Sequence, residues 1–208
     1  MMSSIRNHSL EEARRLNYPV NPNLPELDER QNIRTTAEAA HRMLALHAVV
    51  ASSCGFPKAN ALEWLDREGL AESLEPEEKQ FLEMTTNEAQ NNAMQWQVEA
   101  LWTLAWALGC HDTLDFTDSC ADDFVSMLPD LKAGAATQTF LSGLTIRAKD
   151  ELLRQCDLAY CLHWGAREAA LSSKLIEGAV PENVVRERRR ALEWLISNDG
   201  WDEVSLDT

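Results

Sequence analysis

The sequence predicts an all-α protein, and three kinds of observation support this expectation. Apolar residues recur at helical spacing along most of the chain. Capping boxes or prolines precede these stretches, and glycines follow several of them. The 208 residues are 45% hydrophobic and 25% charged, which is typical of a globular protein with a full core. Because no linker-like segment interrupts the chain, we expect one multi-helix bundle domain over residues 1–208.

The N-terminal part is expected to contain a short helix followed by an extended strap. Ser9 and Glu12 fit a capping box, which predicts a helix that ends near Asn17, within a helical region over residues 1–17. Three prolines in the stretch YPVNPNLP then favour an extended, polyproline-like strap over residues 18–33.

A helical core is predicted over residues 34–200. Thr35 and Glu38 form a capping box ahead of an Ala-rich helix that ends at a glycine. The next helix, over 57–69, begins at a proline and also ends at a glycine. A shorter helix follows over 76–83.

The stretch NEAQNNAMQWQVEALWTLAWALG predicts a buried, Trp-rich helix at the centre of the fold. At 100° per residue, Trp96, Glu99, Trp102 and Trp106 share one side, while leucines and an alanine occupy the other. Both faces are therefore apolar. Glu99 is the only charged residue between Trp96 and Gly109, so its carboxylate needs a buried partner.

The remaining elements are predicted from turn signals and from apolar periodicity. Residues 110–145 are rich in turn formers and are expected to hold one short helix near 121–127 and one further helical turn. A long helix is expected over 145–175, and Pro181 opens the last helix.

Arg188 lies on the predicted inward face of the last helix, among its apolar residues. A buried guanidinium needs a partner, because a buried charge that loses its partner costs about 3–5 kcal/mol. Glu99 is the natural candidate. Two interpretations stay open: a structural ion pair that locks helix packing, which we favour, and a pocket in which Glu99 acts as a general base or Arg188 binds an anion.

A second candidate site lies along one border of the long helix, where aromatic and basic side chains gather within about 100° of arc. Such a set can bind an anionic group, although neighbouring helices satisfy it more often. Together with the first set, the candidate binding residues are Glu99, Trp102, Tyr160, His163, Trp164, Arg167 and Arg188.

The sequence predicts no metal site and no cofactor. The stretch CHDTLDFTDSCADD has neither the spacing of an EF-hand nor a paired CxxC motif, and it is interpreted as N-caps and a solvated acidic surface. The GxSxG, Walker A, GxGxxG and HExxH signatures are also absent from the sequence. We therefore assign no catalytic residue and favour a function other than an enzyme.

The closing stretch WDEVSLDT is predicted to dock on the helical core as a clasp over residues 201–208. Its apolar residues, Trp201 foremost, are unusual for a solvated chain end. Asp202 or Asp207 is expected to reach an exposed arginine such as Arg189.

The charge balance restricts the classes of partner. The chain has 34 Asp and Glu against 19 Lys and Arg, a formal net charge of −15. Nucleic acids and anionic membranes repel such a surface, whereas a basic protein is attracted to it; the acidity also serves solubility. Five cysteines without framework spacing and an N-terminus without an apolar signal core favour reduced thiols in the cytoplasm.

Several stretches together resemble a known family of bacterial proteins. YPVNPNLP, VEALWTLAWALG, LAYCLHWGARE and ERRRALEWLI, followed by WDEVSLDT, are similar to the domain of unknown function 4272 over about residues 18–208. The resemblance implies a mostly helical domain and no established chemistry. It also implies that nine of the residues are family motif positions: Glu99, Trp102, His163, Trp164, Arg167, Arg188, Trp194, Trp201 and Asp202.

Two functions of different classes are consistent with these observations. The first is a non-catalytic, acidic protein-interaction module, such as an adaptor or an immunity-like protein. The second is an enzyme or small-anion binder whose pocket contains Glu99, His163, Arg167 and Arg188.

Overall fold

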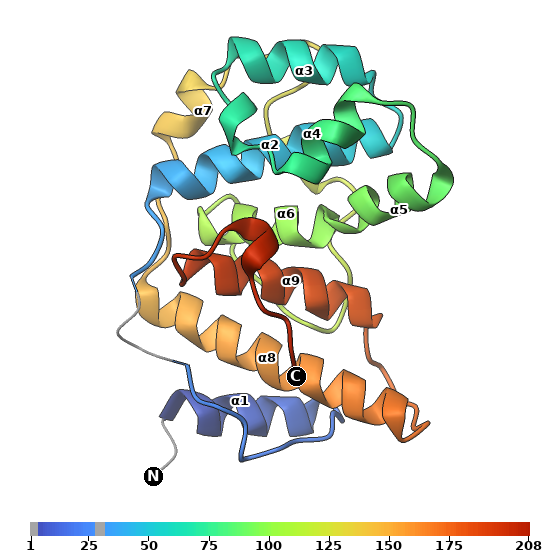
Figure 1. The fold of residues 1–208 in the computed structure, drawn as a ribbon. Coiled ribbons are helices and arrows are strands. Elements are labelled where there is room, and N and C mark those ends of the chain that lie inside the picture. Colours follow the sequence, from blue (N-terminus) through green and yellow to red (C-terminus); the bar gives the residue numbers. More distant parts are fainter. Residues whose placement is uncertain (1–3, 28–31) are drawn as a thin grey trace. The chain divides into compact units, whose positions relative to one another are not determined.

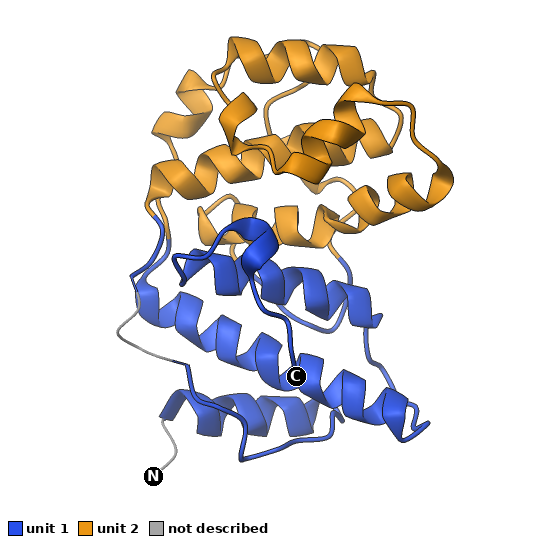
Figure 2. Ribbon diagram, in the orientation of Figure 1, with its two compact units in different colours: residues 1–34, 113–119, 147–208 blue, residues 35–112, 120–146 orange. Residues whose placement is uncertain are grey.

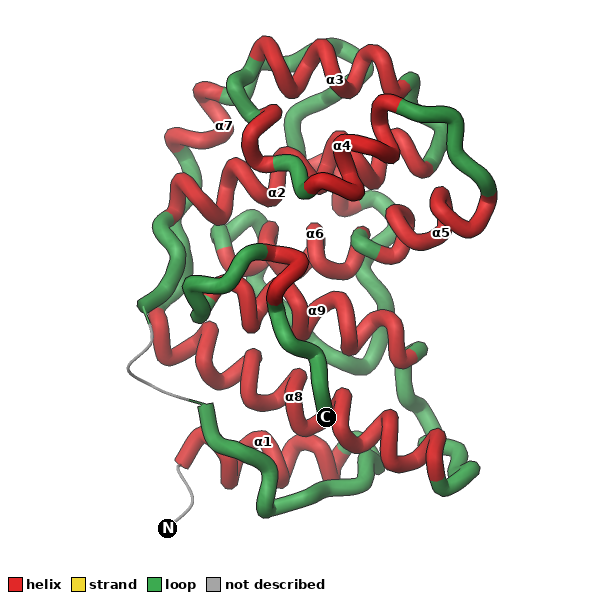
Figure 3. Tube along the Cα trace, in the orientation of Figure 1, coloured by secondary structure: helices red, strands yellow, loops and turns green. Residues whose placement is uncertain are grey.

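The computed structural model describes residues 4–27 and 32–208, and these residues form helices and no strand (Figures 1 and 3). The all-α prediction is confirmed. The chain divides into two compact units (Figure 2). Unit 1 comprises residues 1–34, 113–119 and 147–208, and unit 2 comprises residues 35–112 and 120–146. The single domain over 1–208 stays a prediction.

Unit 1 is a three-helix assembly in which the long helix packs against both others (Figure 1). Its helices are α1 (Ser4–Arg15), α8 (Lys149–Leu171) and α9 (Glu182–Leu195), followed by the short 3-10 helix η3 (Trp201–Glu203). Pro181 precedes α9, as predicted. Buried leucines and alanines of α8 form the apolar part of the interfaces.

Unit 2 is built around its Ala-rich helix, α2 (Thr36–Ser53), which packs against most other helices of the unit. Small side chains let the neighbours approach on all sides, and residues 43–46 of α2 are fully buried. The other elements are α3 (Lys58–Arg67), η1 (Ala71–Ser73), α4 (Pro76–Glu83), α5 (Glu88–Trp96), α6 (Val98–Ala107), η2 (Phe124–Met127) and α7 (Gln138–Ser142).

The local start and stop signals of unit 2 are confirmed. Thr35 Oγ1 accepts a hydrogen bond from the Glu38 backbone N–H at 3.2 Å, and the Thr35 N–H donates to Glu38 Oε2 at 2.8 Å. Gly55 follows α2 and Gly69 follows α3, both with positive φ, which glycine adopts without steric cost.

The Trp-rich stretch differs from its prediction in one respect, because it forms two helices rather than one. Gln97 separates α5 from α6, and its backbone N–H bonds to the Met94 carbonyl oxygen in a tighter turn. Trp96 therefore ends α5, where it is 38% exposed, whereas Trp106 on α6 is 4% exposed. Helix α6 itself is buried, as predicted.

Two further predictions of element bounds need correction. Helix α1 begins at Ser4, and Ser9 lies inside it, where its hydroxyl donates to the Ile5 carbonyl oxygen at 3.2 Å. The long helix spans 149–171 rather than 145–175, because the chain turns at Ser173, which has a positive φ. The extended strap stays a prediction: residues 18–27 are non-helical and include a turn, and residues 28–31 lie outside the described residues.

Candidate functional site

The predicted site residues fall into the two units. Glu99 and Trp102 lie on α6 of unit 2, whereas Tyr160, His163, Trp164 and Arg167 lie on α8, and Arg188 on α9, of unit 1. Each set is described within its own unit, and the ion pair between Glu99 and Arg188 stays a prediction.

Glu99 and Trp102 hold a loop of unit 2 against α6. Glu99 is buried, and its Oε1 accepts a hydrogen bond from the Cys120 backbone N–H at 3.0 Å. Trp102 stacks on His111 with 3.5 Å between ring centroids, and its ring edge meets Phe124 at 5.2 Å. His111 Nε2 lies 2.9 Å from the Trp102 carbonyl oxygen. Both predicted residues therefore position the segment that leads to Phe124.

That segment forms one wall of a groove in unit 2, which we call the acidic groove. The groove has a volume of about 1140 Å³ and lies between α2, the loop after it, the start of α6 and residues 120–132. Phe124 is buried beneath it, and Val125 is 43% exposed at its surface. The apolar part of the lining includes Val50, Phe56, Val98, Phe124, Val125 and Leu128.

The charged part of the lining is mostly acidic. Asp122, Asp123 and Asp130 are exposed, and Lys132 is the basic residue beside them. His47 adds no positive charge near neutral pH, because burial lowers its pKa to about 4. Its Nε2 lies 3.0 Å from the Pro129 carbonyl oxygen, so the neutral ring holds the opposite wall. The groove therefore has an apolar surface that is bordered by negatively charged side chains.

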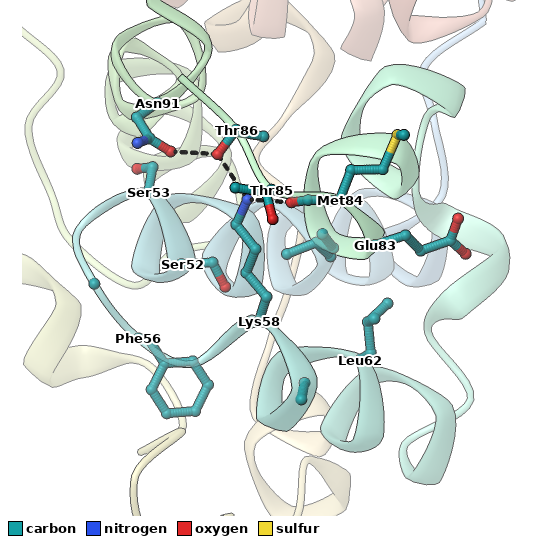
Figure 4. Close-up of a pocket in the computed structure, with 13 residues that line it drawn as sticks. Ser52, Ser53, Phe56, Lys58, Leu62, Glu83, Met84, Thr85, Thr86 and Asn91 are labelled. Atoms are coloured by element: carbon teal, nitrogen blue, oxygen red, sulfur yellow. Dashed lines mark hydrogen bonds between the residues drawn. The ribbon is translucent and has the colours of Figure 1, made fainter. Parts of the chain in front are cut away.

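A second cavity of unit 2, of about 720 Å³, is more polar and has a lysine in its lining (Figure 4). Lys58 Nζ donates to the Phe81 and Met84 carbonyl oxygens at 2.7 and 3.0 Å, and to Thr86 Oγ1 at 2.8 Å. An ammonium has three donors, and these acceptors account for all of them. Lys58 therefore caps the C-terminal end of α4 and leaves no N–H for an anion.

Unit 1 contains a buried ion pair beside the predicted set on α8. Arg6 Nη2 lies 2.7 Å from Asp157 Oδ1, and both side chains are almost fully buried. The same guanidinium donates to the carbonyl oxygens of Leu24 and Pro25 at 2.7 and 2.8 Å. Arg6 thereby ties α1, α8 and the strap together, a role that the sequence analysis missed.

The predicted set on α8 spans the interior and the surface of unit 1. Tyr160 is half-buried between two cations, with the Arg189 guanidinium 4.4 Å and the Arg6 guanidinium 5.8 Å from its ring centroid. Trp164 packs against the small apolar cluster of Leu10, Leu24 and Cys161. Arg167 is exposed.

His163 is buried, and its Nδ1 lies 3.0 Å from Arg189 Nη1. Burial, reinforced by the charges of Arg189, Arg167 and Arg186, lowers the pKa of His163 to about 4. The ring is therefore neutral near neutral pH.

Arg188 is buried, as expected from the face it occupies. It donates to the carbonyl oxygens of Asp115 and Asp118, which places it under the 113–119 segment of unit 1. Phe116 of the same segment lies 5.7 Å from its guanidinium. The partners of Arg188 therefore include backbone carbonyl oxygens, which the pattern of side chains in a sequence cannot predict.

The tail of unit 1 docks through apolar and backbone contacts. Trp201 is 1% exposed, and its ring edge meets Trp194 at 5.6 Å between centroids. Arg189 is buried rather than exposed, contrary to the prediction, and its Nη1 lies 3.2 Å from the carbonyl oxygens of Leu206 and Asp207. Asp207 thus contributes its backbone oxygen to the contact with Arg189, and the side chain of Asp202 is exposed.

Residues 4–27 and 32–208 contain no group of three or more His, Cys, Asp or Glu side chains placed to hold a metal ion. In the same ranges, no helix combines the length and the apolar character that crossing a membrane requires.

The fold thus defines an all-helical protein with an apolar, acidic-edged groove in one unit and a buried network of charges in the other. The chain belongs to the family described as Domain of unknown function (DUF4272), which matches residues 6–204. The resemblance in the sequence is confirmed. No curated protein and no solved structure matches the chain.

Proposed function

We propose that this chain is a non-catalytic protein-interaction module, of the adaptor or immunity-like kind, and that the acidic groove binds its partner. The observation that carries the proposal is the combination of apolar side chains and carboxylates in the lining of one groove. Its volume of about 1140 Å³ exceeds the roughly 300–1,000 Å³ of small-ligand pockets, which favours several side chains of a peptide segment.

The partner is inferred to be a protein segment that carries both apolar and basic side chains. Three aspartates stand against one lysine in the groove lining, so basic residues complement it. Apolar residues at positions i, i+3, i+4 and i+7 of a partner helix would pack on the apolar surface around Val125. The formal net charge of −15 would increase the association rate of such a partner at low salt.

A pair of synthetic amphipathic helices tests the proposal, one with leucine and lysine and one with leucine and glutamate in the same pattern. We expect the lysine peptide to bind in fluorescence anisotropy and the glutamate peptide not to bind. The bound lysine peptide should also protect Cys54 and Cys120, which line the groove, from a thiol reagent. Added salt should weaken binding without abolishing it, because the apolar contacts are not screened.

The variant Val125→Asp separates docking in the groove from general attraction to an acidic protein. It removes an apolar contact and adds a negative charge, so groove binding weakens by about tenfold or more whereas non-specific attraction strengthens. Leu175→Asp is the matched control, since Leu175 is 96% exposed and lies in unit 1. Equal or tighter binding by Val125→Asp would contradict the proposal.

A further inference from the structure

The imidazole of His163 presents a buried donor that lacks an acceptor. Arg189 can only donate, so its 3.0 Å hydrogen bond makes His163 Nδ1 the acceptor and places the ring proton on Nε2. Nε2 is buried and has no hydrogen-bond partner among the described residues. The side chain as a whole is 1% exposed. A buried donor left in this state is destabilising, so an acceptor at this point would be stabilising.

The carboxylate that faces this donor is too far away to bond. Glu182 Oε1 lies 3.8 Å from His163 Nε2 and 3.9 Å from Arg167 Nη1. Both distances exceed hydrogen-bond length, and both outer side chains are partly exposed, Glu182 at 39% and Arg167 at 56%. The carboxylate therefore lies loosely between two donors, where a better-placed acceptor can replace it.

The charges around this point favour an anion. Arg167, Arg186 and Arg189 all act electrostatically on His163. Arg186 pairs with Glu187 at 3.0 Å and Arg189 with Glu193 at 3.2 Å, whereas Arg167 lies 3.9 Å from Glu182 and has the loosest counter-charge of the three. Glu182 is also the first residue of α9, a helix of 14 residues whose N-terminus has no side-chain cap. Uncapped N–H groups and the helix dipole attract negative charge to that end.

We propose that His163, Arg167 and the N-terminus of α9 form a binding site for a small oxyanion group, which we call the His163 site. In this site an anion oxygen accepts the Nε2–H of His163, a second oxygen pairs with Arg167, and the Glu182 side chain moves into solvent. The site lies within unit 1 and is independent of the acidic groove. Phosphate and carboxylate groups share the required chemistry.

The test follows the imidazole nitrogens of the 208-residue chain by NMR during titration with sodium phosphate, sulfate, acetate and chloride at matched ionic strength. We expect a saturating shift of the His163 Nε2 signal with at least one of the oxyanions, and none with chloride. Saturation by phosphate and sulfate alone assigns a tetrahedral ligand, and saturation by acetate assigns a carboxylate. A shift that chloride reproduces, or no saturation with any salt, overturns the proposal.

Three variants make the test specific. Glu182→Gln removes the competing carboxylate and should tighten oxyanion binding several-fold. Arg167→Gln should weaken it about tenfold. Arg154→Gln is the charge-matched control on the exposed side of the same helix and should leave affinity unchanged. If Arg167→Gln and Arg154→Gln weakened oxyanion binding equally, the binding would depend only on the net charge of the protein, and the proposed site would be refuted.

Discussion

Arg189 donates a hydrogen bond of 3.0 Å from Nη1 to Nδ1 of His163, and the same guanidinium also binds the backbone of the tail. Its Nε donates to Glu193 Oε1 at 3.2 Å. One buried cation therefore connects α8, α9 and residues 206–207, and it fixes the tautomer of His163. Because carbonyl oxygens bind Arg189 in the tail, the contact depends on the path of the chain more than on side-chain identity.

The tail contact predicts which substitutions matter there. Asp207→Asn keeps the carbonyl oxygen, so we expect a change in unfolding free energy within about 0.5 kcal/mol. Trp201→Ala empties a buried site against Trp194, so we expect a loss of about 3–5 kcal/mol. Urea unfolding measures both. A large effect of Asp207→Asn would show that the carboxylate, as the sequence suggested, is the group that matters.

The two buried histidines predict that acid destabilises the fold well above the pH at which most carboxylates titrate. Burial lowers the pKa values of His47 and His163 from 6.5 to about 4. Between these pH values the unfolded chain binds protons that the folded chain does not. Stability is therefore complete above about pH 6.5 and falls as the pH decreases toward 4, by at most about 1.4 kcal/mol per pH unit for each histidine.

His47→Gln tests this window for the groove histidine. Glutamine keeps a donor for the Pro129 carbonyl oxygen but does not titrate. We expect the dependence of the unfolding free energy on pH between 7 and 5 to become shallower in the variant, while the contribution of His163 persists. If wild type and variant lose stability in parallel, His47 already takes up its proton in the folded state.

The buried pair of Arg6 and Asp157 predicts strongly non-additive substitutions. Asp157→Asn leaves the buried guanidinium without a counter-charge and should cost about 3–5 kcal/mol. The double variant Arg6→Met/Asp157→Leu removes both charges, and we expect it to be more stable than Asp157→Asn alone. A double-mutant cycle in urea, with Arg6→Met and Asp157→Leu as the single variants, measures the coupling. Additive losses would mean that the two charges do not interact.

Local signals explain which parts of the fold were predictable. The capping box of Thr35 and Glu38 and the proline at the start of α4 act within four residues, so the sequence displays them directly. The break at Gln97 has no such mark, because the apolar pattern continues through it and its backbone angles stay near helical values. Tertiary packing decides that break, as it decides that α1 extends back to Ser4.

The candidate sites were less predictable because their partners are distant or belong to the backbone. Glu99 stood out as a lone charge, but its bond to the Cys120 N–H has no side-chain signature. The acidic groove joins residues near 50, 98 and 125. The adjacent acidic and apolar residues at 122–125 were visible in the sequence, yet only the fold brings them beside α2. His163 and Arg167 were found together because one helical turn relates them.

Replacing Gly165 of α8 with alanine has two opposing effects on the stability of the fold. An added Cβ would lie 2.6 Å from the Pro19 carbonyl oxygen and 3.1 Å from Tyr18 Cβ. Alanine gains about 1 kcal/mol over glycine in a helix interior, whereas overpacking costs about 1–3 kcal/mol. The Pro19 oxygen belongs to the backbone and cannot rotate away, so we expect the clash to dominate in Gly165→Ala and the variant to be destabilised in urea. The strap should also become more susceptible to proteolysis, because residues 18–19 must move off α8.

Gly143→Ala is the control for this substitution, since its nearest contact would be an ordinary 3.5 Å. A Gly165→Ala protein that is more stable than wild type would mean that the strap yields at little cost, and that it does not depend on close contact with α8.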